Sequence, residues 1–200
     1  MRPNVSRETE EKLLAYEALL KKWQSSINLV SLSTLPYLRE RHIDDSLQLV
    51  EHLPFGAKTL CDFGSGAGFP ALVLAMSCPD ISVTMIESDQ RKCAFLKTVS
   101  RETSLANATI FNSRIESLEA YLSYDVFSAR ALAPLVDLFS FMEFFPEHEK
   151  STALFLKGET VESEIQEAEK IFDFEYVLHT SKTHSAGRII EVRSLTRKCA

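Results

Sequence analysis

Residues 60–70, Leu-Cys-Asp-Phe-Gly-Ser-Gly-Ala-Gly-Phe-Pro, constrain the fold more than any other part of this 200-residue chain. The apolar residues before the glycines suit a buried strand, and the run 71–75 after them suits a helix. Glycines at alternate positions let backbone N–H groups approach a ligand with no Cβ atom in the way. The pattern therefore predicts a strand, a ligand-binding turn and a helix, the opening unit of a nucleotide-binding α/β fold.

The spacing of one acidic residue and three glycines narrows the choice of ligand. Asp62, Gly64, Gly66 and Gly68 form the pattern D-x-G-x-G-x-G. A dinucleotide fingerprint, G-x-G-x-x-G, would need glycine where Phe69 stands. The observed pattern resembles motif I of the S-adenosylmethionine (AdoMet)-dependent methyltransferases. The methionine amino group of AdoMet is cationic, so Asp62 would attract it, whereas it would repel a pyrophosphate.

A second acidic residue ends the next predicted strand. Residues 81–86 are rich in β-forming side chains and lead to Glu87. In nucleotide-binding α/β folds an acid at this place holds the ribose hydroxyls. The alternative is that Glu87 caps a helix starting near Gln90 and that the glycines are ordinary turn residues. The order strand, loop, helix, strand favours cofactor binding.

Strands and helices are predicted to alternate after residue 58. We expect seven strands, near residues 58–63, 81–87, 108–112, 124–129, 151–157, 174–180 and 187–195. Helices are expected near 69–77, 90–104, 114–120, 134–145 and 160–171. Such alternation predicts a mostly parallel sheet with helices on both faces, and the short link at 181–186 predicts that the last two strands form an antiparallel hairpin.

The chain before this region is predicted to be helical. Leu13, Tyr16, Leu20, Trp23 and Ile27 recur at the spacing of an amphipathic helix. A second helix is expected from about Thr34 to His52. We therefore divide the chain into an N-terminal helical extension, 1–55, and a Rossmann-like domain, 56–200.

Composition limits the class of protein. The 45% apolar content is that of a globular chain, no run is long enough for a membrane span, and the polar N-terminus lacks the core of a signal peptide. The four cysteines lack C-x-x-C spacing, which indicates free thiols in a cytoplasmic protein. The histidines at 148, 179 and 184 lack metal-ligand spacing, so we expect no metal site.

Charge is distributed unevenly along the chain. Residues 143–175 hold ten acids and three lysines, a balance of −7, so the rest of the chain carries +1 of the total −6. Basic residues around the expected site are Arg39, Arg41, Arg91, Lys92, Lys97, Arg101, Arg114 and Arg130. This asymmetry permits an anionic partner on one face of the molecule.

Several further stretches, taken in order, resemble one family. They are Arg-His-Ile-Asp-Asp-Ser-Leu at 41–47, the loop 64–70, Arg-Lys-Cys-Ala-Phe-Leu at 91–96, Ser-Arg-Ile-Glu at 113–116, Ser-Ala-Arg-Ala-Leu-Ala-Pro-Leu at 128–135 and Leu-Lys-Gly at 156–158. Together they resemble RsmG (also called GidB), bacterial methyltransferases that act on N7 of a guanine in small-subunit (16S) ribosomal RNA. The resemblance implies a class I methyltransferase fold, AdoMet as cofactor, and ribosomal RNA or a small ribosomal particle as partner. We expect no membrane or DNA partner and a monomeric protein.

The resemblance also implies roles for individual residues. Cofactor-binding residues would be Asp62, Gly64, Gly66, Gly68, Phe69, Glu87, Ile115, Glu116 and Arg130, with Ile115 and Glu116 at the adenine. Catalytic residues would be Arg130, His42, Asp45 and Lys157. Each polar position has a structural alternative: an Arg130 ion pair with Asp125 or Asp137, a His42–Asp45 pair, or Lys157 simply ending the fifth strand.

The chain lacks the motifs of two other classes of nucleic-acid methyltransferase, which agrees with N7 as the target. The fourth-strand segment lacks the N-P-P-Y or D-P-P-Y sequence of amino-group methyltransferases, and no cysteine follows a proline as in carbon-5 pyrimidine enzymes. Guanine N7 carries a free lone pair, so catalysis reduces to alignment and electrostatics. Two rival functions remain, a non-catalytic ribosome-associated protein and a nicotinamide-dependent oxidoreductase.

Overall fold

The computed structural model describes residues 5–118 and 122–199, and within them seven strands form one sheet. The strands are β1 (Thr59–Phe63), β2 (Ser82–Glu87), β3 (Ala108–Asn112), β4 (Val126–Arg130), β5 (Thr152–Lys157), β6 (Phe172–Thr180) and β7 (Arg188–Arg197). The predicted seven-stranded α/β fold is confirmed, and each strand lies close to its predicted bounds.

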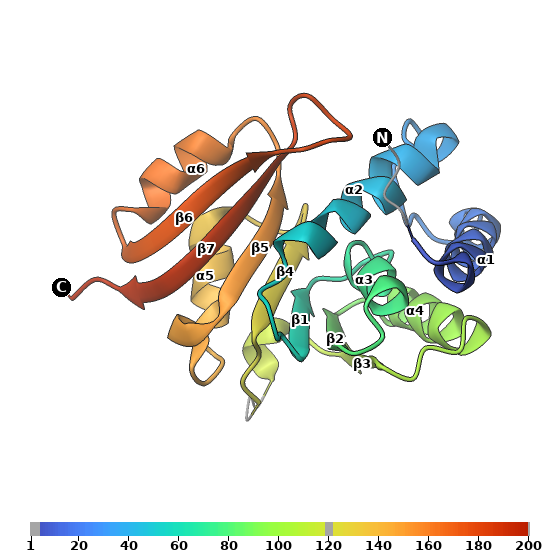
Figure 1. Ribbon diagram of the computed structural model, residues 1–200, viewed down its shortest axis with the longest axis horizontal. Helices are drawn as coiled ribbons and strands as arrows, with labels where there is room; N and C mark the ends of the chain where they lie inside the picture. Colours follow the sequence, from blue (N-terminus) through green and yellow to red (C-terminus); the bar gives the residue numbers. More distant parts are fainter. Residues whose placement is uncertain (1–4, 119–121, 200) are drawn as a thin grey trace.

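The strand order is β3-β2-β1-β4-β5-β7-β6 (Figure 1). β3, β2, β1, β4 and β5 run parallel, whereas β7 is antiparallel to both β5 and β6. The predicted hairpin of the last two strands is therefore confirmed. The order reverses between β1 and β4, and in doubly wound sheets this switch point is where ligands bind, beyond the carboxyl ends of the strands.

The helices and helical turns, in chain order, are α1 (Arg7–Gln24), η1 (Leu35–Tyr37), η2 (Arg39–Asp44), α2 (Asp45–Leu47), η3 (Gln48–His52), α3 (Ala71–Ser77), α4 (Gln90–Glu102), η4 (Ile115–Ser117), α5 (Leu135–Met142), η5 (His148–Lys150) and α6 (Val161–Ala168). Two predictions need correction. The single helix expected over 34–52 is a succession of 3₁₀, π and α turns. The helix expected over 114–120 is only the 3₁₀ turn η4, and residues 119–121 lie outside the described part.

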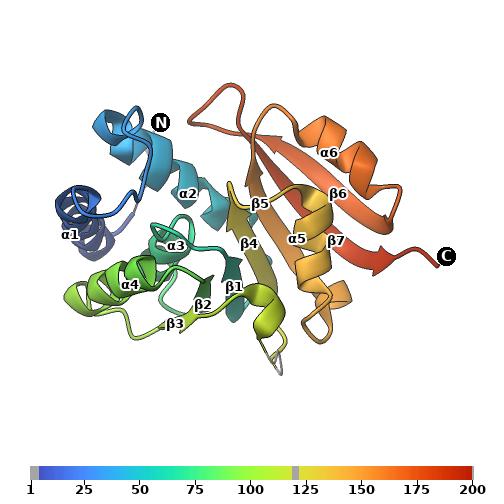
Figure 2. The same cartoon turned by 180° about the vertical axis from the view of Figure 1, so that it is seen from behind.

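Two hydrophobic clusters cover the two faces of the sheet. Neighbouring residues of one strand point to opposite faces, so Leu154 belongs to the cluster with α1, α3 and α4, and Phe155 to the cluster with α5 and α6. Figure 2 shows α5 and α6 on the side of the sheet turned away from the viewer of Figure 1. This three-layer arrangement leaves the carboxyl ends of the parallel strands free to form a site.

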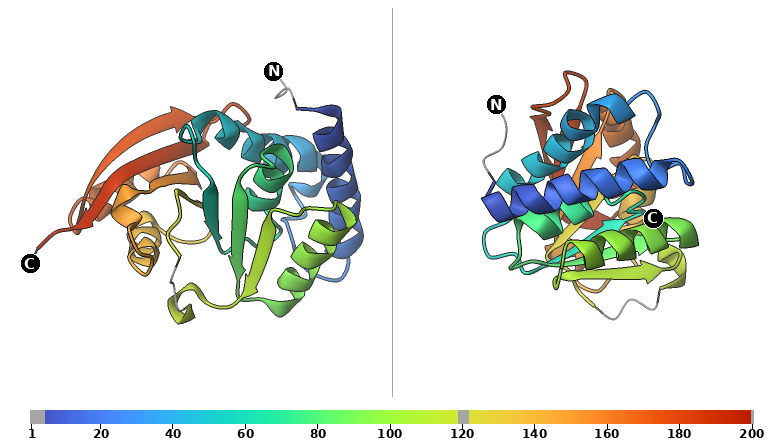
Figure 3. Two further views of the ribbon diagram at one scale, coloured as in Figure 1. Left: turned by 60° about the horizontal axis from the view of Figure 1, so that its bottom comes forward. Right: turned by 90° about the vertical axis from the view of Figure 1, so that its right-hand side faces the viewer.

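The N-terminal helix α1 packs on the same face of the sheet as α3 and α4. The Ser6 hydroxyl accepts a hydrogen bond from the Thr9 N–H at 3.1 Å and caps α1. Leu13, Tyr16 and Leu20 are fully buried and, with the partly buried Trp23, form the predicted apolar stripe. Ile27, also predicted on this helix, lies beyond its end at Gln24. Figure 3 (right) shows α1 lying across α3 and α4. This helix shares its hydrophobic core with the sheet. The predicted division into two domains between residues 55 and 56 stays a prediction. No helix of the described chain is both long and apolar enough to span a membrane.

Candidate active site

A cavity of about 910 Å³ opens at the switch point between β1 and β4. It is lined by eight of the predicted site residues: Gly64, Gly66, Phe69, Glu87, His42, Asp45, Arg130 and Lys157. The structure thus brings together the predicted cofactor loop and all four residues predicted to be catalytic. Among the other predicted residues, Asp62 belongs to β1 and Gly68 to the loop itself, and neither is part of the lining.

Ile115 and Glu116 are not part of the cavity lining. Ile115 is buried in the cluster beneath α5 and α6, whereas Glu116 is exposed on η4. η4 follows β3, which lies beside β2 in the sheet. Contact between this pair of residues and the adenine of a cofactor stays a prediction.

The glycine loop has a backbone conformation that favours glycine at three positions. Gly64, Gly66 and Gly68 have φ values of 59°, 55° and 95°, in the left-handed region that favours glycine. A Cβ atom on Gly68 would collide with the side chain of Leu72, whereas one on Gly66 would meet nothing closer than 3.7 Å. Gly66 therefore leaves open space on the cavity side of the loop.

Glu87 joins the glycine loop to the turn after β2. Its Oε2 accepts a hydrogen bond from the Gly66 N–H and its Oε1 accepts one from the Asp89 N–H, both at 2.8 Å. The alternative role of Glu87 as the helix cap is wrong, because Asp89 caps α4 by accepting a hydrogen bond from the Arg91 N–H at 2.7 Å. Glu87 lines the cavity, and each carboxylate oxygen keeps a second lone pair for a ligand hydroxyl.

Asp62 lies in β1, two positions before Gly64, and is fully buried. Its Oδ1 accepts a hydrogen bond from the Ser128 hydroxyl at 2.6 Å, across the β1–β4 pair. Its Oδ2 is buried with no hydrogen-bond partner in the described chain. Burial raises the pKa of this carboxyl to about 7, against the opposing effect of the Ser128 hydrogen bond. An acceptor left without a partner next to a binding loop is suited to a cationic ligand group.

Arg130, at the end of β4, is the centre of a second polar cluster that lines the cavity. Its Nη2 donates a hydrogen bond to His42 Nδ1 at 2.7 Å, and its guanidinium carbon lies 4.8 Å from the centre of the Phe69 ring. The His42 ring stacks on the same Phe69 ring, with 5.1 Å between centroids. Arg130 Nη1 lies 3.8 Å from Asp45 Oδ2, so the predicted alternative partners, Asp125 and Asp137, are wrong.

His42 is held as a neutral ring. An arginine can only donate, so Nδ1 must accept and the ring proton resides on Nε2, which donates to Thr34 Oγ1 at 2.8 Å. Burial, Arg130 and Arg41 together lower the pKa of His42 to about 3. The alternative of a His42–Asp45 pair is not what forms, because both side chains contact Arg130 instead.

Asp45 links the helical segment to the loop between β6 and β7. Its Oδ1 accepts hydrogen bonds from Thr183 Oγ1 at 2.7 Å, from Gln48 Nε2 at 2.7 Å and from Ser181 Oγ at 3.2 Å. Sequence reasoning missed Thr34, Ser181 and Thr183. Lone hydroxyl residues in loops give no sequence signal, and only the fold brings them to the cavity.

Lys157, the last residue of β5, forms a salt bridge. Its Nζ lies 2.5 Å from Glu164 Oε2 and donates a hydrogen bond to the Ala133 carbonyl at 2.9 Å. The same carboxylate accepts a hydrogen bond from the Leu135 N–H at 3.1 Å. Lys157 thus holds the segment that follows β4, including Leu132, beside the cavity. Glu164 was not predicted, although the acidic first turn of α6 made an anion there visible in the sequence.

Comparison with known proteins agrees with this geometry. The family model described as "GidB: rRNA small subunit methyltransferase G" matches residues 9–193. A protein named ribosomal RNA small subunit methyltransferase G from Parvibaculum lavamentivorans is 46% identical over 198 residues, which covers 96% of this chain and 86% of that protein. Its namesake from Paramagnetospirillum magneticum is 46% identical over 195 residues and is covered to 92%.

Solved structures are similar in fold at low sequence identity. A mutant of MtNAS in complex with S-adenosylmethionine has a TM-score of 0.62 at 12% identity and covers 93% of this chain and 76% of that one. A SAM-dependent methyltransferase from Aquifex aeolicus has a TM-score of 0.59 at 13% identity, with 78% and 93% covered. The fold is that of the class I methyltransferases, and the family match extends over nearly the whole chain. The chain therefore belongs to the rRNA small subunit methyltransferase G (GidB) family.

Proposed function

We propose that this chain transfers the methyl group of AdoMet to N7 of a guanine in small-subunit ribosomal RNA. Its family membership and the names of its relatives support the class of reaction and the RNA. The structural neighbour bound to S-adenosylmethionine supports the cofactor. The finer parts of the proposal, namely the acceptor atom and the role of each residue, rest on the chemistry of the cavity.

The residues around the glycine loop fit AdoMet. The Oδ2 of Asp62, buried without a hydrogen-bond partner in the described chain just before the loop, would complement the cationic amino group of the cofactor. Glu87 would hold the ribose hydroxyls, because its carboxylate faces the cavity while its position is set by backbone N–H groups. Ile115 and Glu116 would contact the adenine. When bound, AdoMet supplies an electrophilic methyl group on a sulfonium.

Arg130 and His42, both packed against the buried Phe69 ring, form the wall on which the target would be placed. Aromatic rings and guanidinium planes are the surfaces on which unpaired RNA bases stack. Arg130 is already fixed by His42 and Asp45, so its remaining N–H groups have a defined direction toward an acceptor on the base, a phosphate or the cofactor. Asp45 would act through Arg130, as a positioning residue.

The state of His42 is the observation that carries the choice of N7. A ring whose pKa is about 3, and whose acceptor nitrogen is occupied by Arg130, cannot take a proton at neutral pH. Lys157 is paired with Glu164. The Asp45 carboxylate is also engaged, because its Oδ1 accepts three hydrogen bonds and its Oδ2 lies beside Arg130. Guanine N7 needs no deprotonation before it attacks the methyl group. A site of this kind favours an acceptor that carries its own lone pair.

Basic side chains at the cavity rim support an RNA partner. Arg41, Lys92 and Arg188 line the same cavity as the cofactor loop. They would contact phosphates, which position RNA without reading its sequence. Two acidic residues, Glu159 and Glu164, also line the cavity, and the Glu164 carboxylate is paired with Lys157. An activity on ribosomal RNA would place the protein in the cytoplasm. We still expect a monomer that binds neither DNA nor membranes.

Methylation of small ribosomal particles by the purified protein tests the proposal. We expect mass spectrometric mapping to find one new 7-methylguanine in the small-subunit RNA. We also expect Arg130→Ala and Arg130→Lys to lower the single-turnover rate at least about tenfold, which corresponds to roughly 1.4 kcal/mol of lost transition-state stabilisation.

Arg197→Ala is the matched control. Arg197 also lies over a phenylalanine ring, at 4.5 Å from the centre of Phe172, but far from the cavity. Its loss should leave the rate unchanged. RNA binding without methyl transfer would instead support a non-catalytic ribosome-associated protein. Binding of NADH in place of AdoMet would support an oxidoreductase.

A further inference from the structure

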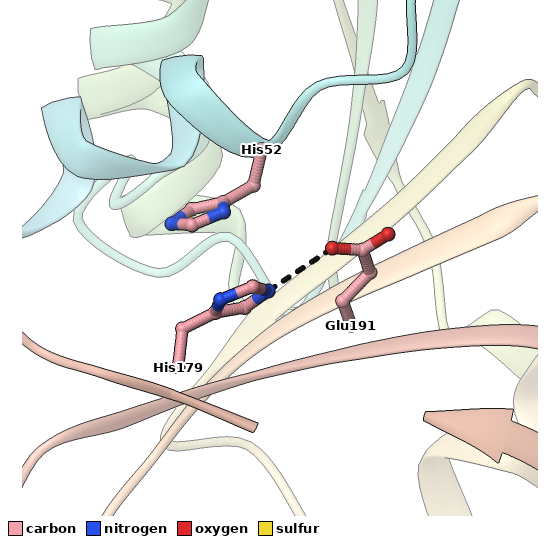
Figure 4. Close-up of side chains that lie close together, drawn as sticks. All are labelled: His52, His179 and Glu191. Carbon is pink, nitrogen blue, oxygen red and sulfur yellow. Dashed lines mark hydrogen bonds and ion pairs between the residues drawn. The ribbon is translucent and has the colours of Figure 1, made fainter. Parts of the chain in front are cut away.

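Three side chains of the kinds that bind metal ions meet between η3 and the β6–β7 hairpin, and none of them lines the cavity. They are His52 at the end of η3, His179 on β6 and Glu191 on β7 (Figure 4). One ligand atom from each lies within 4.8 Å of the others. The imidazole rings face each other at 4.1 Å between centroids, and His179 Nε2 lies 3.1 Å from Glu191 Oε2.

The register of the hairpin creates half of this cluster. Val177 pairs with Glu191 and His179 pairs with Ile189 across the antiparallel strands. His179 and Glu191 are therefore diagonal neighbours on one face of the sheet. His52 is placed above that face because Gln48, one helical turn earlier, donates a hydrogen bond to Ser181 and accepts one from the N–H of Lys182.

The carboxylate of Glu191 is already positioned like a metal ligand. Arg193 Nη2 lies 2.6 Å from its Oε1, which leaves Oε2 turned toward the imidazoles. Ligating carboxylates are held in this way by a partner outside the ligand set. His52 adds a second imidazole, with a ring nitrogen within 4.8 Å of the ligand atoms of His179 and Glu191.

We propose that His52, His179 and Glu191 bind one divalent transition-metal ion, with Zn²⁺ as the best match. Two imidazole nitrogens and one carboxylate oxygen suit Zn²⁺, whereas Mg²⁺ and Ca²⁺ prefer oxygen ligands alone. Water completes a tetrahedral site. At metal–ligand distances of about 2.0–2.1 Å, neighbouring ligand atoms lie roughly 3.4 Å apart. The ligand atoms, which lie within 4.8 Å of one another, would draw together around the ion.

The cations near the cluster are neutralised by carboxylates. Lys182 forms an ion pair with Glu51, and Arg193 pairs with Glu191. A bound ion would connect the helical segment 35–52 to the β6–β7 hairpin, whose loop also reaches Asp45 through Ser181 and Thr183. An ion that binds only the folded chain stabilises it by mass action. Zn²⁺ should therefore raise the melting temperature.

Zinc titration of chelator-treated protein tests the proposal in a Cys199→Ser background, which removes the exposed thiol. We expect one Zn²⁺ per chain by calorimetry and a zinc-dependent rise in melting temperature. Mutation of a residue that only supports a ligand already lowers metal affinity about tenfold. His179→Gln and Glu191→Gln, which each remove a ligand, should therefore weaken zinc binding at least about tenfold. Co²⁺ should give visible absorption without a thiolate charge-transfer band.

His148→Gln is the matched control. His148 Nδ1 also lies near a carboxylate, 3.8 Å from Glu149 Oε2, but on η5 and away from the cluster. It should bind zinc like the parent. Equal affinity in the parent, His179→Gln and Glu191→Gln would overturn the proposal, as would no binding to the parent or a thiolate band with Co²⁺. If His179→Gln fails to fold, the isosteric Glu191→Gln decides.

Discussion

Replacing Asp62 by asparagine should change how the stability of the protein depends on pH. Asp62 is fully buried, its Oδ2 has no partner in the described chain, and burial raises its pKa from the ordinary 3.8 to about 7. Between these two pH values the folded protein retains a proton that the unfolded chain has lost. The unfolding free energy therefore falls as pH rises through this window.

The size of the effect follows from the width of the window. One pH unit corresponds to 1.36 kcal/mol, so a window of about three units costs the folded state about 4 kcal/mol once pH exceeds 7. An asparagine does not titrate. The unfolding free energy of Asp62→Asn minus that of the parent should therefore increase by up to about 4 kcal/mol between pH 4 and pH 8. Any cost of burying the amide itself appears as a constant offset.

Urea unfolding of both proteins across this pH range provides the measurement. Asp125→Asn is a control of opposite sign, because hydrogen bonds from the backbone N–H groups of Lys58 and Thr59 lower the pKa of Asp125. Its stability contribution should be present at neutral pH and disappear as pH falls. A pH-independent difference between Asp62→Asn and the parent would refute the argument. AdoMet affinity should nevertheless fall about tenfold in Asp62→Asn, since the carboxylate that we propose attracts the cofactor amino group is lost.

Two further predictions concern the loop and the chemistry. Gly66→Val should abolish AdoMet binding by calorimetry, whereas Gly56→Val should retain it; both replace a glycine at positive φ, but only Gly66 lines the cavity. Unchanged affinity in a folded Gly66→Val protein would contradict the loop assignment. Single-turnover methyl transfer with both substrates saturating should vary little between neutral and mildly alkaline pH, because His42 stays neutral and N7 needs no base. A steep rise of that rate with an apparent pKa in the range would point to an amine or carbon acceptor.

Local patterns in the sequence were sufficient for the sheet and the cofactor loop. Strand alternation, helix spacing and the positive-φ requirement at Gly64, Gly66 and Gly68 each depend on a few neighbouring residues. They therefore predicted all seven strands and the glycine turn between β1 and α3. The segment 34–52 was predicted less well. The choice among 3₁₀, α and π turns there depends on packing against distant elements and not on apolar spacing.

Only the tertiary structure decided which polar groups meet. Arg130 and His42 are 88 positions apart in the chain, and Asp45 and Ser181 are 136 apart. The burial that raises the pKa of Asp62 also depends on the pairing of β1 with β4, which sets Asp62 opposite Ser128. The meeting of His52, His179 and Glu191 depends on hairpin register together with the docking of η3. Local sequence determines which elements form and which face of each is apolar, whereas side-chain contacts across elements depend on how those elements pack.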